Sequence, residues 1–354
     1  MNKIKLGDKL VGKGDKPYFI ADIGANHDGN LERAYKLIEL AKEAGADAAK
    51  FQNFQAEKIV SKLGFEKLGN QIGHQATWKK SVYEIYEEAS ISKNWTSLLK
   101  NKCDEVGITY FTSPYDLDSV DLVDPFVDFY KIGSGDITWL EIIEYIAKKN
   151  KPVLLATGAS NFNDVVRAMN IIESYTNDII LMQCNTNYTL DIDKYKYVNL
   201  NVLKTFANRF PNTILGLSDH TIGHSTVLGA IALGAVVIEK HFTDDNNNEG
   251  PDHKFAMNPK SWREMVDNAN ILYHSLGDGV KIVESNEENA SIVQRRCLRA
   301  KVDLSSGHIL TKEDFESLRP IPIDGLPPYM LNDLLGKVLK KSLKKGSHIT
   351  LKHF

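Results

Sequence analysis

Residues 216–224, Gly-Leu-Ser-Asp-His-Thr-Ile-Gly-His, and residues 236–242, Val-Val-Ile-Glu-Lys-His-Phe, contain the pattern that decides the fold. Each stretch is an apolar run that ends abruptly in polar, ionisable residues, and residues 225–234 between them are predicted to form one short helix. Two parallel strands joined by a helix bring their carboxyl ends to the same edge of a sheet. We therefore expect His220 and His241 to lie side by side, an arrangement that suits a divalent metal ion.

The same theme, an apolar run ending in polar residues and followed by a helix-patterned segment, recurs between residues 18 and 276. The eight runs are Tyr18–Ala25, Ala48–Phe54, Ile108–Pro114, Phe129–Ser134, Val153–Gly158, Ile179–Asn185, Ile214–Asp219 and Val236–Phe242. Near-continuous apolar strands alternating with helices favour a parallel α/β sheet. Eight uninterrupted units predict a (β/α)8 barrel rather than an open doubly wound sheet. Neither G-x-G-x-x-G nor a Walker A sequence supports the open sheet.

The chain is predicted to fold as two domains. Residues 1–279 are expected to form the barrel, residues 280–294 a polar linker, and residues 295–354 a small domain of short β-like pieces and tight turns. The barrel carries a long insertion at residues 55–90, which could be a lid or an oligomer contact. A polar excursion at residues 244–253 follows the eighth strand, and we expect it to have a functional role.

Composition excludes several classes of protein. The net charge of −3 and pI near 6.4 give no basic field for nucleic acid or an anionic membrane. The start of the chain is too polar for a signal peptide, and no run approaches about 18 apolar residues. Cys103, Cys184 and Cys297 are far apart and form no zinc spacing, so we expect reduced thiols in a cytoplasmic protein. Cys184 is expected to be buried and inert rather than a nucleophile.

Active sites of (β/α)8 barrels lie at the carboxyl ends of the strands, so the residues at those ends are the candidates for a site. Lys50 and Lys131 alternate with apolar neighbours and should point into the barrel, where a lysine needs an anion beside it. A phosphate or carboxylate substrate would supply the anion, with Ser134 as a further donor. The alternative is that these lysines pair inside the barrel with Asp22 or Glu239.

A metal site is the second hypothesis for these strand ends. Glu239 and Asp252 lie near the two histidines in sequence, which favours metal binding over a reading in which both imidazoles are core residues. Histidine and carboxylate ligands suit Mn²⁺, Mg²⁺, Fe²⁺ or Zn²⁺, and ligand type does not choose between them. Such an ion would act as a Lewis acid on a carbonyl oxygen.

Several of these segments together resemble the bacterial type of the sialic acid synthase family, which makes sialic, legionaminic and pseudaminic acids. The matching segments are Ile20–Gly29, Lys50–Gln52, Lys131–Asp136, Gly216–Thr221, Glu239–Thr243 and Gly250–His253. The resemblance runs through the whole barrel. Residues 295–354 are similar to the family's C-terminal SAF domain, a β-clip fold like type III antifreeze protein.

The resemblance implies a transferase that condenses phosphoenolpyruvate with an N-acetylated amino sugar in its open-chain aldehyde form. The sugar would be N-acetylmannosamine or a diacetamido-trideoxyhexose, and phosphate would leave by C–O cleavage to give a nonulosonic acid. His220 and His241 would hold Mn²⁺, with Mg²⁺ or Co²⁺ as alternatives.

The resemblance also assigns roles to the strand-end residues. Phosphoenolpyruvate would be bound by Lys50, Lys131, Ser134, Tyr188 and Ser218. Asp22, Gln52 and Glu239 would be the catalytic residues, with Gln52, Glu239 and the sugar-binding Asp252 facing the sugar and the metal-bound side. The family forms a domain-swapped homodimer, in which Arg319 of the partner chain would reach the sugar's N-acetyl group.

Three departures from the family pattern leave the sugar open. The family usually has Glu where Asp22 stands, and a common Ser is replaced by Ala156, a loss for which the neighbouring Thr157 could compensate. The sixth strand reads Gln183-Cys184-Asn185-Thr186-Asn187-Tyr188, with Thr186 where the family has Asn.

Two other functional classes compete with the synthase. One is a Schiff-base aldolase that uses Lys50 or Lys131. The other is a non-catalytic carbohydrate- or ice-binding protein, suggested by the antifreeze-like tail, although such a protein has no need for eight polar strand ends.

Overall fold

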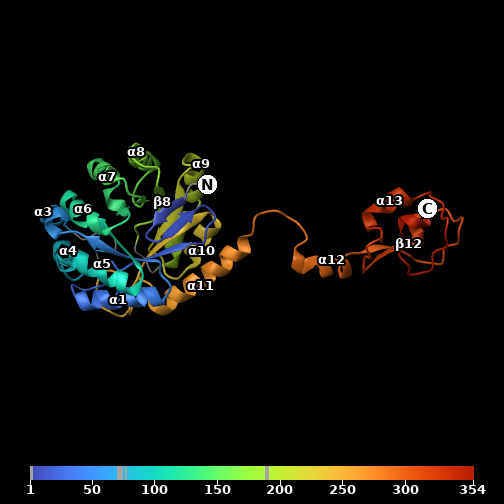
Figure 1. Cartoon of the computed structure of the whole chain (residues 1–354), viewed down its shortest axis with the longest axis horizontal. Coiled ribbons are helices and arrows are strands. Elements are labelled where there is room, and N and C mark those ends of the chain that lie inside the picture. The colour runs from blue at the N-terminus through green and yellow to red at the C-terminus, as the bar shows by residue number, and fades with distance from the viewer. Residues whose placement is uncertain (1–2, 70–74, 76–77, 188–190) are drawn as a thin grey trace. The chain divides into compact units, whose positions relative to one another are not determined.

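The computed structural model describes residues 3–69, 75, 78–187 and 191–354, which form two compact units, Met1–Gly277 and Asp278–Phe354 (Figure 1). The first unit is an eight-stranded parallel sheet surrounded by helices. Its strands are β3 (Tyr18–Asp22), β4 (Ala48–Asn53), β5 (Thr109–Pro114), β6 (Tyr130–Ile132), β7 (Val153–Ala156), β8 (Ile179–Cys184), β9 (Ile214–Asp219) and β10 (Ala235–His241). Each coincides with one of the eight apolar runs, so the predicted (β/α)8 barrel is confirmed.

The strands pair in the order β5-β4-β3-β10-β9-β8-β7-β6, and the first and last strands of the series, β3 and β10, are hydrogen-bonded neighbours. Between β5 and β6, both within the described residues, no ladder forms. Side chains pack there instead: Phe111 of β5 lies against Phe129, with ring centroids 4.4 Å apart. The sheet is therefore a near-closed barrel with a single open seam.

The surrounding helices present apolar stripes to the sheet. They are α1 (Leu31–Glu43), α5 (Trp95–Val106), α6 (Leu117–Val123), α7 (Leu140–Ala147), α8 (Phe162–Glu173), α9 (Val202–Arg209), α10 (Ser225–Ala232) and α11 (Pro259–Leu276). In α1, Ala34, Leu37, Ile38 and Ala41 are buried, the spacing of one helix face. Asn30 caps the start of this helix, because its side chain accepts from the backbone N of Arg33.

An N-terminal hairpin of β1 (Lys3–Leu6) and β2 (Lys9–Gly12) was not expected from the sequence. Its Ile4, Leu6 and Val11 are buried in the barrel core. Lys9 contacts Asp47, whose carboxylate also accepts from the backbone N of Phe19 at 2.7 Å. The hairpin therefore packs at the end of the barrel where the strands begin.

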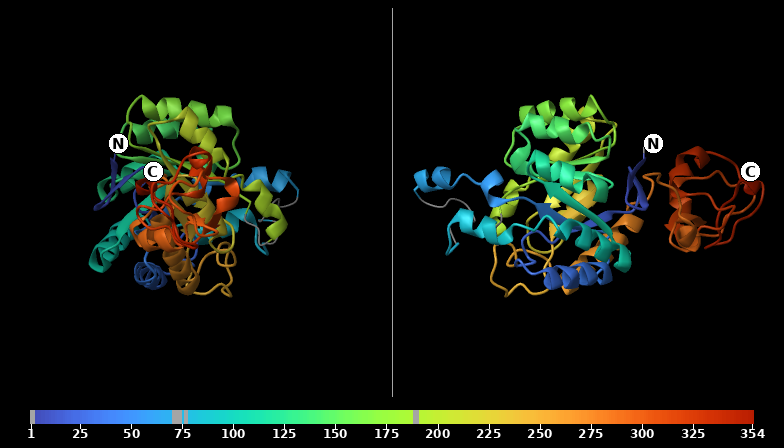
Figure 2. Two further views of the ribbon diagram at one scale, coloured as in Figure 1. Left: turned by 90° about the vertical axis from the view of Figure 1, so that its right-hand side faces the viewer. Right: turned by 60° about the vertical axis from the view of Figure 1, so that its left-hand side comes forward.

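The insertion at residues 55–90 forms α2 (Ala56–Ile59), α3 (Lys62–Lys67) and α4 (Val82–Ala89), and α3 projects away from the barrel (Figure 2). Tyr86 of α4 packs on Phe54 with ring centroids 5.3 Å apart, and Phe54 packs on Tyr115 at 5.9 Å. Both Phe54 and Tyr115 directly follow strands. The insertion therefore contacts the end of the barrel that carries the polar residues.

The second unit has its own small core. Its β11 (Cys297–Ala300) and β12 (Phe315–Leu318) pair antiparallel, α13 (Leu331–Leu334) follows, and Leu298, Leu304 and other leucines pack together. The segment 280–294, predicted as a linker, is largely exposed but carries the helix α12 (Glu288–Val293). None of the helices in the described parts of the chain has the length and apolarity needed to cross a membrane.

Candidate active site

Four charged side chains meet inside the barrel at the carboxyl ends of the strands. Lys50 Nζ lies 2.7 Å from Asp22 Oδ2 and 3.4 Å from Glu239 Oε1, and Lys131 Nζ lies 2.6 Å from the same Glu239 oxygen. Each of the four is at most 3% exposed. The structure thus shows the internal ion pairing that the sequence left as the alternative to anion binding. Two positive and two negative charges balance within this cluster.

Burial and pairing act in opposite directions on these groups. Burial raises the pKa of Glu239, but Lys131 and Lys50 outweigh it and hold that pKa at about 2. Burial lowers the pKa of Lys50, yet Asp22 and Glu239 raise it above its usual value. Burial and the nearby charge of Lys50 lower the pKa of Lys131, although Glu239 acts to raise it. Lys131 is therefore the more easily deprotonated of the two lysines.

The two histidines lie next to each other, as predicted. The rings of His220 and His241 have centroids 5.4 Å apart and both side chains are buried. His220 Nδ1 is 2.9 Å from the carbonyl oxygen of Asn185, which can only accept, so Nδ1 carries the proton and Nε2 keeps its lone pair. Burial and the neighbouring His241 lower the pKa of His220 to about 3, which keeps it in the neutral, metal-binding form.

Two carboxylates lie near this pair of histidines. Asp252 Oδ2 lies 3.6 Å from His241 Nδ1, and Asp22 Oδ2 lies 3.7 Å from His241 Nε2. Among the described residues, no group of three or more His, Cys, Asp and Glu side chains is arranged to hold a metal ion. A divalent ion at this pair would therefore have two imidazole ligands and would take its remaining ligands from oxygen atoms.

Hydroxyl groups surround the lysines. Ser134 Oγ accepts from the backbone N of Gly158 at 2.9 Å, and Ser218 Oγ donates to Glu239 Oε1 at 3.1 Å. Thr157 was expected to replace the hydroxyl missing at Ala156, but its Oγ1 donates to the carbonyl of Met182 at 2.9 Å. This hydroxyl is already used within the sheet, so the compensation is not seen. Tyr188, predicted to bind phosphoenolpyruvate, lies outside the described residues.

The residues predicted for the sugar side adjoin His241. Gln52 Nε2 donates to Asp22 Oδ2 at 3.3 Å, and Asp252 Oδ2 accepts from the backbone N of Ala25 at 3.3 Å. Gly24 has φ +49°, and a Cβ there would lie 3.0 Å from Asp252 Oδ2. The first barrel loop therefore packs tightly against these side chains. Arg319 belongs to the second unit, where it is exposed, and its role in the partner's site stays a prediction.

Two further side chains were not assigned a role from the sequence. Asp136, in the short helix Ser134–Asp136 after β6, has its pKa raised to about 6 by burial. Tyr86, from the insertion, has its pKa raised by burial and by the charges of Asp252 and Asp136. The available signal for Asp136 was a carboxylate that directly follows a buried strand. No comparable signal marked Tyr86, because it lies in the insertion.

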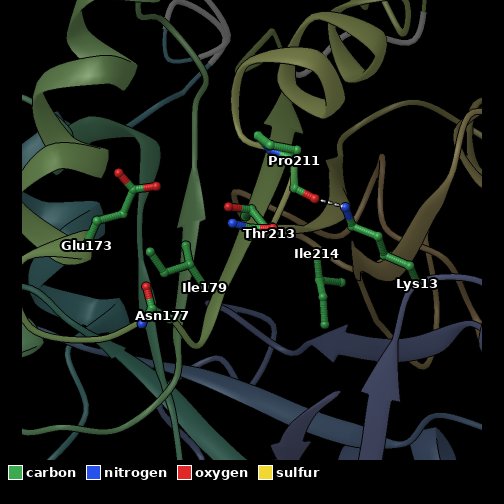
Figure 3. Close-up of a pocket in the computed structure, with 8 residues that line it drawn as sticks. Lys13, Glu173, Asn177, Ile179, Pro211, Thr213 and Ile214 are labelled. Atoms are coloured by element: carbon green, nitrogen blue, oxygen red, sulfur yellow. Dashed lines mark hydrogen bonds between the residues drawn. The ribbon is translucent and has the colours of Figure 1, made fainter. Parts of the chain in front are cut away.

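Cys184 agrees with the prediction of an inert thiol, since it is buried and burial raises its pKa. A separate cavity of about 390 Å³ lies where β8 and β9 begin, lined by Lys13, Glu173, Asn177 and Pro211 among others (Figure 3). The histidines and lysines lie at the opposite ends of the strands. This cavity is therefore not part of the polar site.

Comparison with known proteins agrees with this geometry. The model of the NeuB family matches residues 37–281, and the model of the SAF domain matches residues 295–354. The chain belongs to the NeuB family. The resemblance to the sialic acid synthase family and the predicted SAF fold of the tail are thereby confirmed.

Relatives of this NeuB-family protein cover nearly its whole length. An uncharacterized protein of Methanocaldococcus jannaschii is 37% identical over 322 residues, 90% of each chain. The N,N'-diacetyllegionaminic acid synthase of Campylobacter jejuni is 33% identical over 339 residues, 94% of this chain and 99% of the relative. The crystal structure of N-acetylneuraminic acid synthetase from Leptospira borgpetersenii, in complex with citrate, matches with a TM-score of 0.71 and 27% identity, over 82% of this chain and 95% of that one.

Proposed function

We propose that this NeuB-family protein condenses phosphoenolpyruvate with an N-acetylated amino sugar to form a nonulosonic acid and phosphate. One observation carries the proposal: a buried lysine pair with adjacent hydroxyls lies beside a two-histidine donor set at the same end of the barrel. The first half suits a small polyanion, and the second suits an aldehyde held on a cation. The synthase names of the relatives support the same reaction class.

Phosphoenolpyruvate would bind at the lysine half. Its phosphate and carboxylate groups would replace Asp22 and Glu239 as partners of Lys50 and Lys131, because together they offer several anionic oxygens as acceptors. Ser134 would add a hydroxyl donor. Its Oγ accepts from Gly158 N, and its hydroxyl hydrogen, which interacts with Cys184, would turn to a ligand oxygen.

The sugar would bind on the histidine side. His220 and His241 would hold a divalent ion, Mn²⁺ in our proposal with Mg²⁺ or Co²⁺ as alternatives, that polarises the aldehyde oxygen as a Lewis acid. Gln52 and Asp252 would orient the sugar through its hydroxyl groups. The first barrel loop bonds Asp252, which lies 3.6 Å from His241, and Gln52 bonds Asp22 at the end of β3.

Glu239 would change its basicity during the reaction. While Lys131 and Lys50 pair with it, its pKa is about 2 and it is a poor base. Once the substrate's anionic groups take over the lysines, the same burial raises that pKa. Glu239, with Asp22 beside it, could then accept a proton from the water that adds at C2 of phosphoenolpyruvate after its C3 has attacked the aldehyde. Phosphate then leaves with C–O cleavage.

The second unit would complete the site in a domain-swapped homodimer, with Arg319 of the partner chain binding the N-acetyl group. Large apolar side chains along its start support a protein partner there. Val280, Ile282, Val283, Ile292 and Val293 are between 42% and 60% exposed, an unusual density for a surface that stays in water. The cytoplasmic location stays a prediction.

A Schiff-base aldolase is the second candidate, because the lowered pKa of Lys131 is what such a lysine requires. Borohydride trapping with pyruvate separates the two reactions. The synthase gives no adduct and loses its activity to EDTA, whereas an aldolase is trapped covalently and tolerates the chelator.

The direct assay is phosphate release from phosphoenolpyruvate in the presence of Mn²⁺, with N-acetylmannosamine and diacetamido-trideoxyhexoses as acceptors. We expect release with at least one sugar and none without a sugar. No release with any acceptor would overturn the proposed function.

A further inference from the structure

We propose that His253 is a positioning residue that fixes Asp252 in the sugar half of the site by joining two barrel loops; the inference rests on the proposed function. His253 lies in the loop that follows β10 and its side chain is fully buried. Its Nε2 lies 3.1 Å from Asp28 Oδ1 in the loop after β3, and its Nδ1 lies 2.7 Å from Thr243 Oγ1. We call Asp28, Thr243 and His253 the interloop clasp.

The hydrogen-bond chemistry fixes the direction of the clasp. A carboxylate can only accept, so His253 Nε2 donates to Asp28, while the Thr243 hydroxyl can donate or accept at Nδ1. Arg33 Nε holds the same Asp28 carboxylate at 3.2 Å, and Asn246 Nδ2 donates to the His253 carbonyl at 2.8 Å. Both the ring and the backbone of His253 are therefore restrained.

The clasp affects the sugar half of the site because Asp252 directly precedes His253 in the chain. Its Oδ2 accepts from Ala25 N, in the loop that also contains Asp28, and lies 3.6 Å from His241 Nδ1. A rotation of the His253 backbone would therefore move the Asp252 carboxylate away from the first loop and from His241. Rigid support of this kind is what keeps a substrate-orienting group in place.

Gly250 supplies independent geometric support. A Cβ at this position would lie 2.6 Å from His253 Cδ2 and 3.3 Å from Asp28 Oδ1. Any side chain at residue 250 would thus push the imidazole off its partner. Gly250→Ala disturbs the clasp without removing a polar group.

The alternative is that the clasp only stabilises the fold, and the Michaelis constants of the two substrates distinguish these roles. In His253→Ala we expect the KM for the sugar to rise by about tenfold or more, with the KM for phosphoenolpyruvate within about twofold of wild type. Gly250→Ala should shift the sugar KM in the same direction. Asp28→Asn should stay close to wild type, because the amide oxygen still accepts from Nε2 and Asn tolerates the φ of +50° at this position.

Asp47→Asn is the matched control, since it removes a carboxylate that joins segments at the opposite end of the barrel. It should lower stability and leave both KM values unchanged. If His253→Ala does not fold, Gly250→Ala decides the question in its place.

The outcomes separate the clasp from the proposed function. An active wild type whose His253→Ala and Gly250→Ala variants keep the sugar KM, or raise both KM values equally, would overturn the positioning role alone. A wild type that releases no phosphate would overturn the proposed function and the role of the clasp with it.

Discussion

Glu239 carries the charge balance of the site, because a single carboxylate oxygen faces both Lys131 and Lys50. Glu239→Gln leaves two buried lysines with Asp22 as their one acidic partner. Removing one member of a buried ion pair costs about 3–5 kcal/mol, so we expect a loss of that order in the free energy of unfolding. Added phosphate should recover more stability in the variant than in wild type, since it replaces the missing charge.

Ser218→Ala is the control for that experiment, because it removes only a neutral hydrogen bond to the same oxygen. Its loss should be about 1 kcal/mol in chemical denaturation. A Glu239→Gln protein as stable as wild type would contradict the balanced-charge description of the cluster.

Asp136 gives a prediction for pH dependence. Burial raises its pKa to about 6, so between about pH 4 and pH 6 the folded chain holds a proton that the unfolded chain has lost. The free energy of unfolding contributed by this group therefore falls as pH rises through that window. Asp136→Asn lacks the ionisable group and should be more stable than wild type at pH 7.5 by on the order of 1–2 kcal/mol.

Denaturant midpoints of both proteins measured at pH 4.5 and at pH 7.5 provide the test. The gain should shrink towards zero at the lower pH, where wild-type Asp136 is protonated as well. An equal difference at both pH values would show that the carboxyl does not titrate in this window.

The sequence identified most of these residues but not how they pair. A buried lysine at a strand end requires a negative partner, and this rule correctly selected Lys50 and Lys131. Which partner they meet depends on the register between neighbouring strands, which places Asp22 level with both Lys50 and His241. Register follows from the shear of the whole barrel, which no single segment encodes.

At the scale of elements, the turn after β7 is held against the turn after β6. A Cβ on Gly158 would lie 2.5 Å from Thr186 Cγ2 and 2.9 Å from Ser134 Oγ. Gly158→Ala should therefore displace Ser134 and raise the KM for phosphoenolpyruvate by about tenfold, with little change for the sugar.

Gly135→Ala is the matched control for this substitution. It lies in the adjacent turn, where a Cβ would meet nothing within 4 Å, so both KM values should stay at wild type. If Gly158→Ala behaves like the control, Ser134 does not contribute to binding of phosphoenolpyruvate.

Elements with a long apolar run could be predicted, and those without one could not. The eight barrel strands are buried on both faces and so read as continuous hydrophobic segments. The N-terminal hairpin has strands of four residues and buries only three apolar side chains, which is too little signal to separate it from a loop. The helix α12 has no buried residue, so no apolar stripe marks it in the sequence.

At the scale of the whole molecule, the proposed domain swap predicts an active site shared between chains. In the proposed domain swap, a His241→Asn chain supplies an intact Arg319 to its partner, and an Arg319→Ala chain supplies an intact barrel. Mixing the two inactive variants under exchange conditions should restore roughly a quarter of wild-type activity at low sugar concentration, because half of the dimers are mixed and each has one complete site. Mass measurement verifies that the chains have exchanged. If activity does not recover after verified exchange, each barrel uses its own second unit.

The proposed sharing of the site between chains could not be derived from the pattern of residues. The repeat of strand and helix predicts one barrel, and the change of composition near residue 280 predicts a second domain. Contacts between chains leave no periodicity in a sequence, so the assignment of Arg319 depends on family resemblance. Only the exposed apolar side chains between residues 280 and 293 give it physical support.

The fate of the bridging oxygen of phosphoenolpyruvate tests the central claim most directly. Phosphoenolpyruvate labelled with ¹⁸O between C2 and phosphorus would be incubated with the enzyme, Mn²⁺ and the accepted sugar, and the phosphate analysed by mass spectrometry. The proposed condensation cleaves the C–O bond, so the released phosphate should retain the ¹⁸O. Unlabelled phosphate, with the ¹⁸O in the organic product, would contradict the account.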